Sequence, residues 1–284
     1  MNRFMNNVKT LLLLVGLWSV FMAVGGSFFG QTGLIIAFVL GGAMNIVAYF
    51  FSDKIALASM RAQQVTDAEA PELVQMVREL SEKAGLPMPR VFICPQDSPN
   101  AFATGRNPRH AAVAVTQGIL EILDHNELRG VVGHELAHIK HRDILITCVA
   151  ASIAGAISML GYMLWFVPLG GDRRGGNPLV AIAMIILAPI AAMLIQMAIS
   201  RKREYYADDF GAELAGDPMY LATALERLHS VSRRRPMKVM MDSQKSMFIV
   251  QPFSGRNAAD WFNTHPSLKK RLTALIGRES TGRV

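Results

Sequence analysis

The chain has 284 residues, which is enough for one or two domains. Hydrophobic residues make up 51% of it and charged residues only 18%, a balance typical of a membrane protein. The net charge of +7 would also suit a nucleic-acid partner, but the basic residues lie mostly beside apolar runs and form no stripe with aromatic residues. We therefore expect a lipid bilayer and no nucleic acid as a partner.

The N-terminal part predicts a transmembrane hairpin. No charged residue occurs between residues 9 and 53, and the polar and glycine residues at 30–33 divide this stretch into two apolar runs, 11–29 and 34–51. Each run is about long enough to cross the bilayer core. The first run is long for a secretory signal and the second follows at once, so a hairpin is the better interpretation. Asn45, inside the second run, is expected to face another helix and not lipid.

A soluble segment follows the hairpin. An amphipathic helix is expected first, three short β-like runs separated by prolines come next, and a short helix leads into a longer one. The expected elements are Pro71–Ala84, Arg90–Cys94, Asn100–Thr104, Ala111–Thr116 and Gln117–Leu123.

The second half repeats this alternation of apolar and soluble segments. Two more uncharged runs, 144–166 and 179–200, are candidate spans; four such runs of membrane length argue against buried core helices. Helices are then expected from Arg201 to about Ala215, from Asp217-Pro218, and from Thr264-His265-Pro266.

The resulting fold class is a mainly α membrane protein with four transmembrane helices in two hairpins and a small α+β catalytic domain. Residues 1–51 form the first hairpin and residues 52–143 the first part of the catalytic domain. Residues 144–200 form the second hairpin and residues 201–284 the second part.

The most informative motif is His134-Glu135-Leu136-Ala137-His138, which reads H-E-x-x-H. Two imidazoles four residues apart lie on one face of a helix and can bind one metal ion, with Glu135 beside it. Asp124 and Glu127 form an expected capping box at the start of this helix. The alternative is a surface helix with two solvated histidines.

A catalytic zinc ion normally has three protein ligands and one open position, so a third ligand is needed. Glu204 and Asp208 are four residues apart on one face of a predicted helix. Glu204 can bind the metal, while Asp208 is expected to accept a hydrogen bond from a histidine ligand, His134, and to fix its tautomer. A charged helix end outside the membrane would show the same residues.

The predicted crossings favour the catalytic interpretation. The chain between His138 and Glu204 holds two spans, so both helices return to the same membrane face. With four spans, both termini and both soluble segments also share one side. Nine lysine and arginine residues flank the spans on that side against two on the other, which places the active site and both termini in the cytoplasm.

At this point the sequence resembles the HtpX family of membrane-bound zinc metalloproteases, which are related to the CAAX prenyl proteases. Four stretches and the four-span layout carry the resemblance. The stretches are Asn100-Ala101-Phe102-Ala103-Thr104-Gly105, the His134 motif, Ser200-Arg201-Lys202-Arg203-Glu204 with Ala207-Asp208, and Thr264-His265-Pro266. The resemblance implies a zincin-like (gluzincin) domain and an endopeptidase of the bacterial cytoplasmic membrane. Its expected substrates are misfolded or surplus membrane proteins in quality control and stress responses, and association with other quality-control proteases is a further implication.

These residues predict zinc-assisted peptide hydrolysis with one Zn²⁺ per chain. His134, His138 and Glu204 are the expected metal ligands, and Glu135 is the expected general base. An exposed edge strand made of Asn100, Ala101, Phe102, Ala103 and Thr104 would pair with an extended substrate. His265 would donate to the developing oxyanion, although it could equally be a helix-start residue, and Arg201 or Tyr205 could take the same role.

Three other functions compete with this hypothesis. A prenyl-peptide protease would use the same chemistry but needs a chamber for a lipid, and four spans look too few. A membrane chaperone or scaffold with a structural zinc ion would not need Glu135. A metal transporter would need ionisable residues inside its spans, where Asn45 and Gln196 are almost the sole polar residues.

Overall fold

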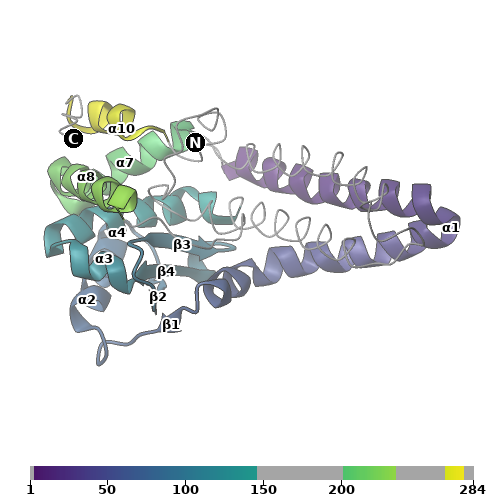
Figure 1. Ribbon diagram of the computed structural model, residues 1–284, viewed down its shortest axis with the longest axis horizontal. Coiled ribbons are helices and arrows are strands. Elements are labelled where there is room, and N and C mark those ends of the chain that lie inside the picture. The colour runs from purple at the N-terminus through teal and green to yellow at the C-terminus, as the bar shows by residue number, and fades with distance from the viewer. Residues whose placement is uncertain (1–2, 146–200, 235–265, 278–284) are drawn as a thin grey trace.

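The computed structural model describes residues 3–145, 201–234 and 266–277. In Figure 1 a compact α/β body occupies one end of the molecule, and a long helical hairpin projects from it. The second predicted hairpin at 144–200 lies almost wholly outside the described residues, as do His265 and the segment 237–256.

The projecting hairpin is formed by α1 (Arg3–Ser59), in which Gly30 breaks the helix with φ 60° and ψ −147°. Its two arms contact each other: Asn45 Nδ2 donates to the Leu14 carbonyl over 3.0 Å, and Trp18 Nε1 donates to the Phe38 carbonyl over 3.1 Å. The predictions of a turn at residues 30–33 and of Asn45 facing another helix are therefore confirmed.

Most of the large exposed hydrophobic side chains in the described residues belong to α1. Among these residues, α1 is the one helix long and apolar enough to cross a membrane, and its most apolar window is Gly30–Val47. Such a surface is unstable in water, because large apolar patches favour a lipid or protein partner. The exposed side chains of the hairpin include Leu11, Leu12, Val15, Leu34, Ile35, Ile36, Phe38, Val39, Leu40, Ile46, Val47, Phe50 and Phe51.

The body is built on a four-stranded mixed sheet of order β1-β2-β4-β3. The strands are β1 (Gln63–Gln64), β2 (Arg90–Cys94), β3 (Ala101–Gly105) and β4 (Ala111–Thr116). β4 is parallel to β2 and antiparallel to β3, so β3 forms one edge of the sheet. Every residue of β4 is buried, as expected for a central strand covered on both faces.

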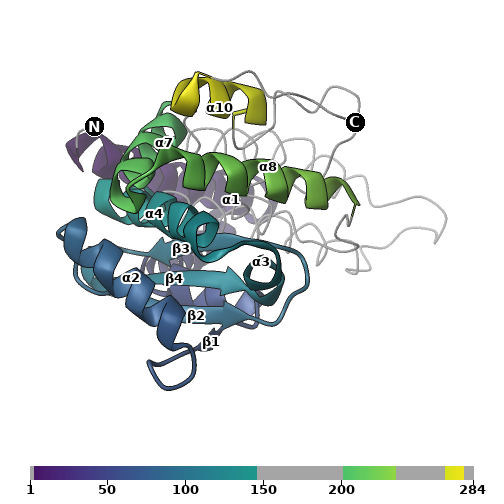
Figure 2. The ribbon, with the colours of Figure 1, turned by 90° about the vertical axis from the view of Figure 1, so that its left-hand side faces the viewer.

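Helices cover one face of this sheet. They are α2 (Pro71–Lys83), α3 (Gln117–Ile122), α4 (His125–His141), α7 (Arg201–Ala215), α8 (Pro218–Arg234) and α10 (Leu268–Ile276). Figure 2 shows α4 directly above β3, with α7 and α8 above α4 and α10 outermost. The segments before and after residues 146–200 are therefore neighbours in one body.

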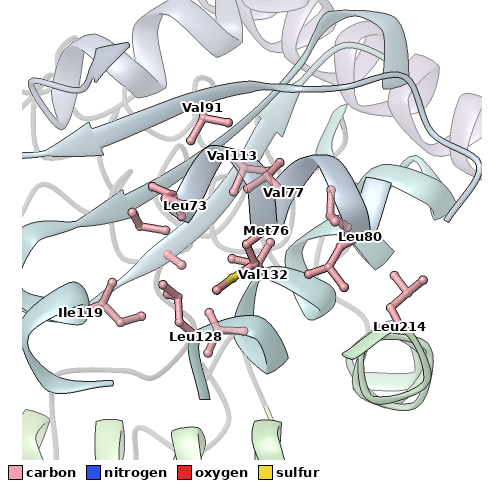
Figure 3. Close-up of a cluster of buried hydrophobic side chains, with 14 of the residues drawn as sticks. Leu73, Met76, Val77, Leu80, Val91, Val113, Ile119, Leu128, Val132 and Leu214 are labelled. Carbon is pink, nitrogen blue, oxygen red and sulfur yellow. The ribbon is translucent and has the colours of Figure 1, made fainter. Parts of the chain in front are cut away.

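The core lies between the sheet, α2, α3 and α4. Figure 3 shows side chains from these elements pointing toward one another, with Leu214 of α7 beside them. Val77, Leu80, Val113 and Val132 are fully buried there. On the opposite face of the sheet, alternate residues such as Phe92 and Phe102 pack against the last turns of α1. The base of the hairpin is thus part of the hydrophobic core.

Two glycines let α4 and α7 approach closely. A Cβ added to Gly211 of α7 would lie 2.6 Å from the His134 backbone nitrogen, and one added to Gly133 of α4 would lie 2.6 Å from the Gly211 carbonyl oxygen. Both distances are far below van der Waals contact. No larger residue fits at either position unless the helices separate.

The predicted elements agree with the structure to within about two residues. The capping box of Asp124 and Glu127 is confirmed by both of its hydrogen bonds. The last helix begins at Leu268, later than predicted from Thr264-His265-Pro266. The two-residue strand β1 was not predicted, because two glutamines pairing with Phe92 and Ile93 leave no alternating apolar pattern in the sequence.

We expect Gly211→Ala to lower the free energy of unfolding by about 1–3 kcal/mol, the usual cost of overpacking a close contact. The added methyl group must push α7 away from His134, so metal retention should fall as well. Thermal unfolding and zinc content of the detergent-solubilised protein measure both effects.

The matched control is Gly42→Ala in α1, where an added Cβ has no atom within 4 Å. It should leave stability unchanged or raise it by up to about 1 kcal/mol, because alanine favours a helix more than glycine does. Wild-type stability and zinc content in Gly211→Ala would contradict the close-packing argument.

Candidate metal centre

Helix α4 presents the H-E-x-x-H motif to the interior. The Asp124 side chain accepts hydrogen bonds from the backbone nitrogens of Asn126 and Glu127 at 2.9 Å each, which fixes where the helix begins. His134 and Glu135 are buried, at 1% and 5% exposure. The two histidine rings lie edge to face with their centroids 4.8 Å apart. The motif is therefore not a solvated helix face, which excludes the surface-helix alternative.

Helix α7 brings a third donor to the two histidines. The Glu204 carboxylate oxygens lie 3.8 Å from His134 Nε2 and 3.7 Å from His138 Nε2, and the two Nε2 atoms are 3.2 Å apart. These separations resemble the ligand spacing of about 3.3–3.6 Å around a tetrahedral metal with bonds of about 2.0–2.2 Å. Two imidazole nitrogens and one carboxylate oxygen form a donor set suited to a divalent metal ion.

Each histidine also has a carboxylate at its other ring nitrogen. His134 Nδ1 lies 2.9 Å from Asp208 Oδ1, and His138 Nδ1 lies 3.5 Å from Asp143 Oδ2. With Nδ1–H of His134 directed at Asp208 and that of His138 facing Asp143, both Nε2 lone pairs can point at the shared position beside Glu204. Carboxylates in this position fix the ring orientation and raise the basicity of a histidine ligand.

Asp208 is held in turn by Arg271 of α10. Arg271 Nε donates to Asp208 Oδ2 over 2.8 Å, and Nη2 of the same side chain donates to Oδ1. Burial alone would raise the pKa of the Asp208 carboxyl, but the Arg271 guanidinium outweighs it and holds that pKa below its usual range. Asp208 therefore remains ionised and able to accept from His134.

Acidic side chains outnumber basic ones in this buried cluster. Four buried carboxylates, those of Glu135, Asp143, Glu204 and Asp208, meet two buried guanidinium groups, those of Arg203 and Arg271. Carboxylates therefore outnumber guanidinium groups among the described side chains, and burying several carboxylates together is costly. Burial alone would lower the pKa of His138, but the Asp143 hydrogen bond and the charges of Glu204 and Glu135 raise it to about 9. The cluster thus favours cations, a divalent metal ion among them.

Glu135 connects the motif to the sheet edge. Its Oε2 atom accepts a hydrogen bond from the backbone nitrogen of Ala103 over 2.8 Å. In an antiparallel ladder alternate residues direct their backbone groups outward, so this N–H belongs to the free edge of β3. The expected base and the expected substrate strand are therefore in direct contact.

The comparisons with known proteins agree with this geometry. Residues 67–279 match Peptidase family M48. The chain belongs to peptidase family M48. It is 47% identical over 281 residues to the Protease HtpX homolog of Paraburkholderia phytofirmans, covering 98% of this chain and 99% of that one. It is 48% identical over 274 residues to the Protease HtpX homolog of Syntrophobacter fumaroxidans, covering 94% and 97%.

A solved structure shares the fold. Ste24p of S. mikatae superimposes with a TM-score of 0.51 at 18% sequence identity, over 96% of this chain and 66% of that one. With the family assignment, this confirms the predicted resemblance to HtpX proteases and to relatives of the CAAX proteases. The chain is a membrane metalloprotease with a mainly helical fold.

Two partners of the site were not predicted, Asp143 and Arg271. Arg271 had a detectable signal: it lies on the apolar side of its helix, between Leu268 and Leu275, where a charged residue needs a buried partner. Asp143 had none. It follows Arg142, whose left-handed conformation (φ 59°) ends α4 and turns the chain back beside His138.

The candidate oxyanion residues remain predictions. His265 lies outside the described part of the chain, and of Arg201 only the backbone is described, at the start of α7. Tyr205 follows Glu204 on α7 and is half-buried.

We expect Asp208→Asn to weaken zinc binding about 10- to 100-fold in this M48 peptidase, the usual effect of losing a carboxylate behind a histidine ligand. Asp209→Asn is the matched control, because Asp209 is the adjacent residue on α7 but is exposed. Competition with a chromophoric chelator measures both affinities. Equal affinities in the two variants would contradict the role given to Asp208.

Asp143→Asn should weaken zinc binding to a similar degree, about 10- to 100-fold, because it removes the charge behind His138 Nδ1. The control is Asp67→Asn, which removes the partner of an exposed Arg78 ion pair far from the histidines. The same chelator competition applies. A wild-type affinity in Asp143→Asn would show that Asp143 is merely a packing residue.

Proposed function

We propose that this M48 peptidase is a zinc endopeptidase that hydrolyses membrane proteins at the cytoplasmic face of the bacterial inner membrane. The observation that carries the proposal is the buried cluster of two imidazoles and one carboxylate, in contact with a sheet edge. The clustered donor set fits Zn²⁺, which takes nitrogen and oxygen ligands in a catalytic site.

His134, His138 and Glu204 would hold one zinc ion per chain. When bound, such an ion polarises a carbonyl group and acidifies water. The residues around it supply the remaining functions: Asp208 and Asp143 orient the two imidazoles, and Arg271 holds Asp208 in place. All of these groups are fixed before substrate arrives, which lowers the cost of reorganisation during catalysis.

Glu135 would act as the general base. Its carboxylate is buried within the motif, where it can accept a proton from water at the site and return it to the leaving amine. In the described structure this carboxylate is held by the Ala103 N–H, so its position depends on the β3 backbone. The hydrogen bond keeps the acceptor oxygen close to the strand along which a peptide would lie.

The substrate would add to the edge of β3. Of the residues predicted to bind it, Asn100, Ala101, Phe102 and Thr104 have buried side chains and Ala103 is half-buried, so their side chains offer little for sequence recognition. Backbone pairing through Ala101, Gly105 and the carbonyl of Ala103 would supply the contacts, since the Ala103 N–H already holds Glu135. Broad selectivity for unfolded segments follows, which suits the removal of misfolded or surplus membrane proteins in stress responses, alone or with other quality-control proteases.

The cytoplasmic placement and the four spans rest on the sequence. The excess of lysine and arginine beside the soluble segments favours a cytoplasmic catalytic body. The packing of α7 onto α4 is compatible with an even number of crossings between them. We propose in addition that the catalytic body has a zincin-like fold.

We expect Glu135→Gln to lower kcat for cleavage of an unfolded protein by about 10²- to 10⁴-fold, because it removes the proton acceptor and keeps the shape of the side chain. Zinc content should remain one per chain. Casein cleavage and elemental analysis of the protein purified in detergent test both expectations.

The matched control is Glu121→Gln, which changes an exposed glutamate on α3. It should keep wild-type activity. Wild-type cleavage by Glu135→Gln with zinc retained would disprove the role of Glu135 as the base. No cleavage by the zinc-loaded parent protein would favour a chaperone or scaffold with a structural metal ion.

A further inference from the structure

A second feature of the molecule lies where the α1 hairpin joins the body, away from the metal centre. A hollow of about 580 Å³ opens there between the last turns of α1, the start of β2 and the turn between β3 and β4. In Figure 1 this turn points toward the hairpin side of the body. The hollow is lined by Phe50, Phe51, Asp53, Lys54, Met88, Arg90, Arg106, Arg109, His110 and Ala111.

The hollow is strongly basic. Four of its side chains are cationic, namely Lys54, Arg90, Arg106 and Arg109, and Asp53 is the one acidic side chain in its lining. Asp53 Oδ2 binds Arg90 at 2.7 Å, so this acid is already engaged. The lining therefore carries a net charge of +3 around one concave space.

Exposed aromatic rings lie between these cations. Phe50 and Phe51 are 49% and 44% exposed, which is unusual for such large apolar side chains. Arg106 lies over the Phe50 ring at 5.7 Å from its centroid, and Lys54 lies over the Phe51 ring at 5.2 Å. The cations are thus held beside an apolar surface and remain accessible.

The position of the hollow along α1 places both its cations and its exposed aromatic rings near the bilayer surface. The most apolar window of α1 ends at Val47, and Phe50 and Phe51 follow within the next turn. Aromatic side chains at this depth occupy the membrane interface, and cations directly beyond them lie at the level of the lipid phosphates. A soluble anion would gain nothing from the two exposed phenyl rings, whereas a lipid has both an anionic headgroup and acyl chains.

We propose that this hollow binds the headgroup of an anionic phospholipid, with its phosphate among Lys54, Arg106 and Arg109 and its acyl chains against Phe50 and Phe51. Phosphatidylglycerol has the required charge and size. The inference rests on the membrane placement of α1 and is independent of the catalytic roles given to the metal-centre residues.

Lipid binding here would orient the catalytic body. Arg106 directly follows Gly105, the last residue of β3, and Ala103 of the same strand binds Glu135. A lipid that holds the β3–β4 turn at the membrane surface therefore holds the substrate edge at a fixed height above it. A bound phospholipid would direct β3 toward segments that emerge from the bilayer.

The test uses full-length Glu135→Gln protein, which prevents self-cleavage, delipidated in detergent. Native mass spectrometry counts retained lipid during titration with phosphatidylglycerol or phosphatidylcholine of the same acyl chains. The variant is Arg106→Gln/Arg109→Gln. The control, Arg78→Gln/Lys83→Gln, removes two positive charges from α2 on the far side of the body.

The expected result is one preferred phosphatidylglycerol per chain, bound about 30-fold more weakly by the Arg106/Arg109 variant, since each basic residue contributes about five-fold near a membrane surface. The α2 control should bind as the parent does. Equal binding of the two lipids, an equal loss in the control, or displacement of the lipid by inorganic phosphate at comparable affinity would each overturn the proposal. Failure of α1 to associate with any lipid would instead refute the membrane placement itself.

Discussion

The close contact of α4 with α7 is the constraint on which the site depends. Gly133 and Gly211 remove the side chains that would separate the two helices. At this distance Glu204 and Asp208, one turn apart on α7, reach the two sides of the same imidazole: Glu204 faces His134 Nε2 and Asp208 faces His134 Nδ1. A larger separation of the helices would lose both contacts together.

The charges of the site follow from this packing. Burying four carboxylates next to two histidines is unfavourable unless cations compensate them. Arg271 supplies one compensating charge from the last described helix, and Arg203 supplies another beside Asp143 at 3.5 Å. Helices from three parts of the sequence thus meet at one cluster. Imidazoles and carboxylates gathered in this way suit a divalent cation.

The sheet links this cluster to the membrane. β3 lies at the sheet edge next to helix α4 of the metal centre, with Ala103 bound to Glu135 at its middle. At its end the chain turns through Arg106 and Arg109 into the basic hollow beside Phe50. The same strand therefore contacts the proposed base and the proposed lipid site. This arrangement is consistent with a protease that selects substrates by their position relative to the membrane and largely independently of their sequence.

By itself the sequence determined the elements and the chemical type of the site. Local signals carried this information: the H-E-x-x-H spacing, the Asp124 capping box, the apolar runs and the proline-separated strands, each of which depends on residues close in the chain. These predictions could not include Asp143 and Arg271. Asp143 reaches His138 because of the left-handed turn at Arg142, and Arg271 reaches Asp208 across 63 residues. Such contacts depend on how helices pack in three dimensions. Only the tertiary structure decided three features: the close approach of α4 and α7 at Gly211, the grouping of charges at the metal centre, and the contact of α1 with the β3–β4 turn. Each of these features joins groups that are distant in the sequence, and no local pattern encodes their proximity.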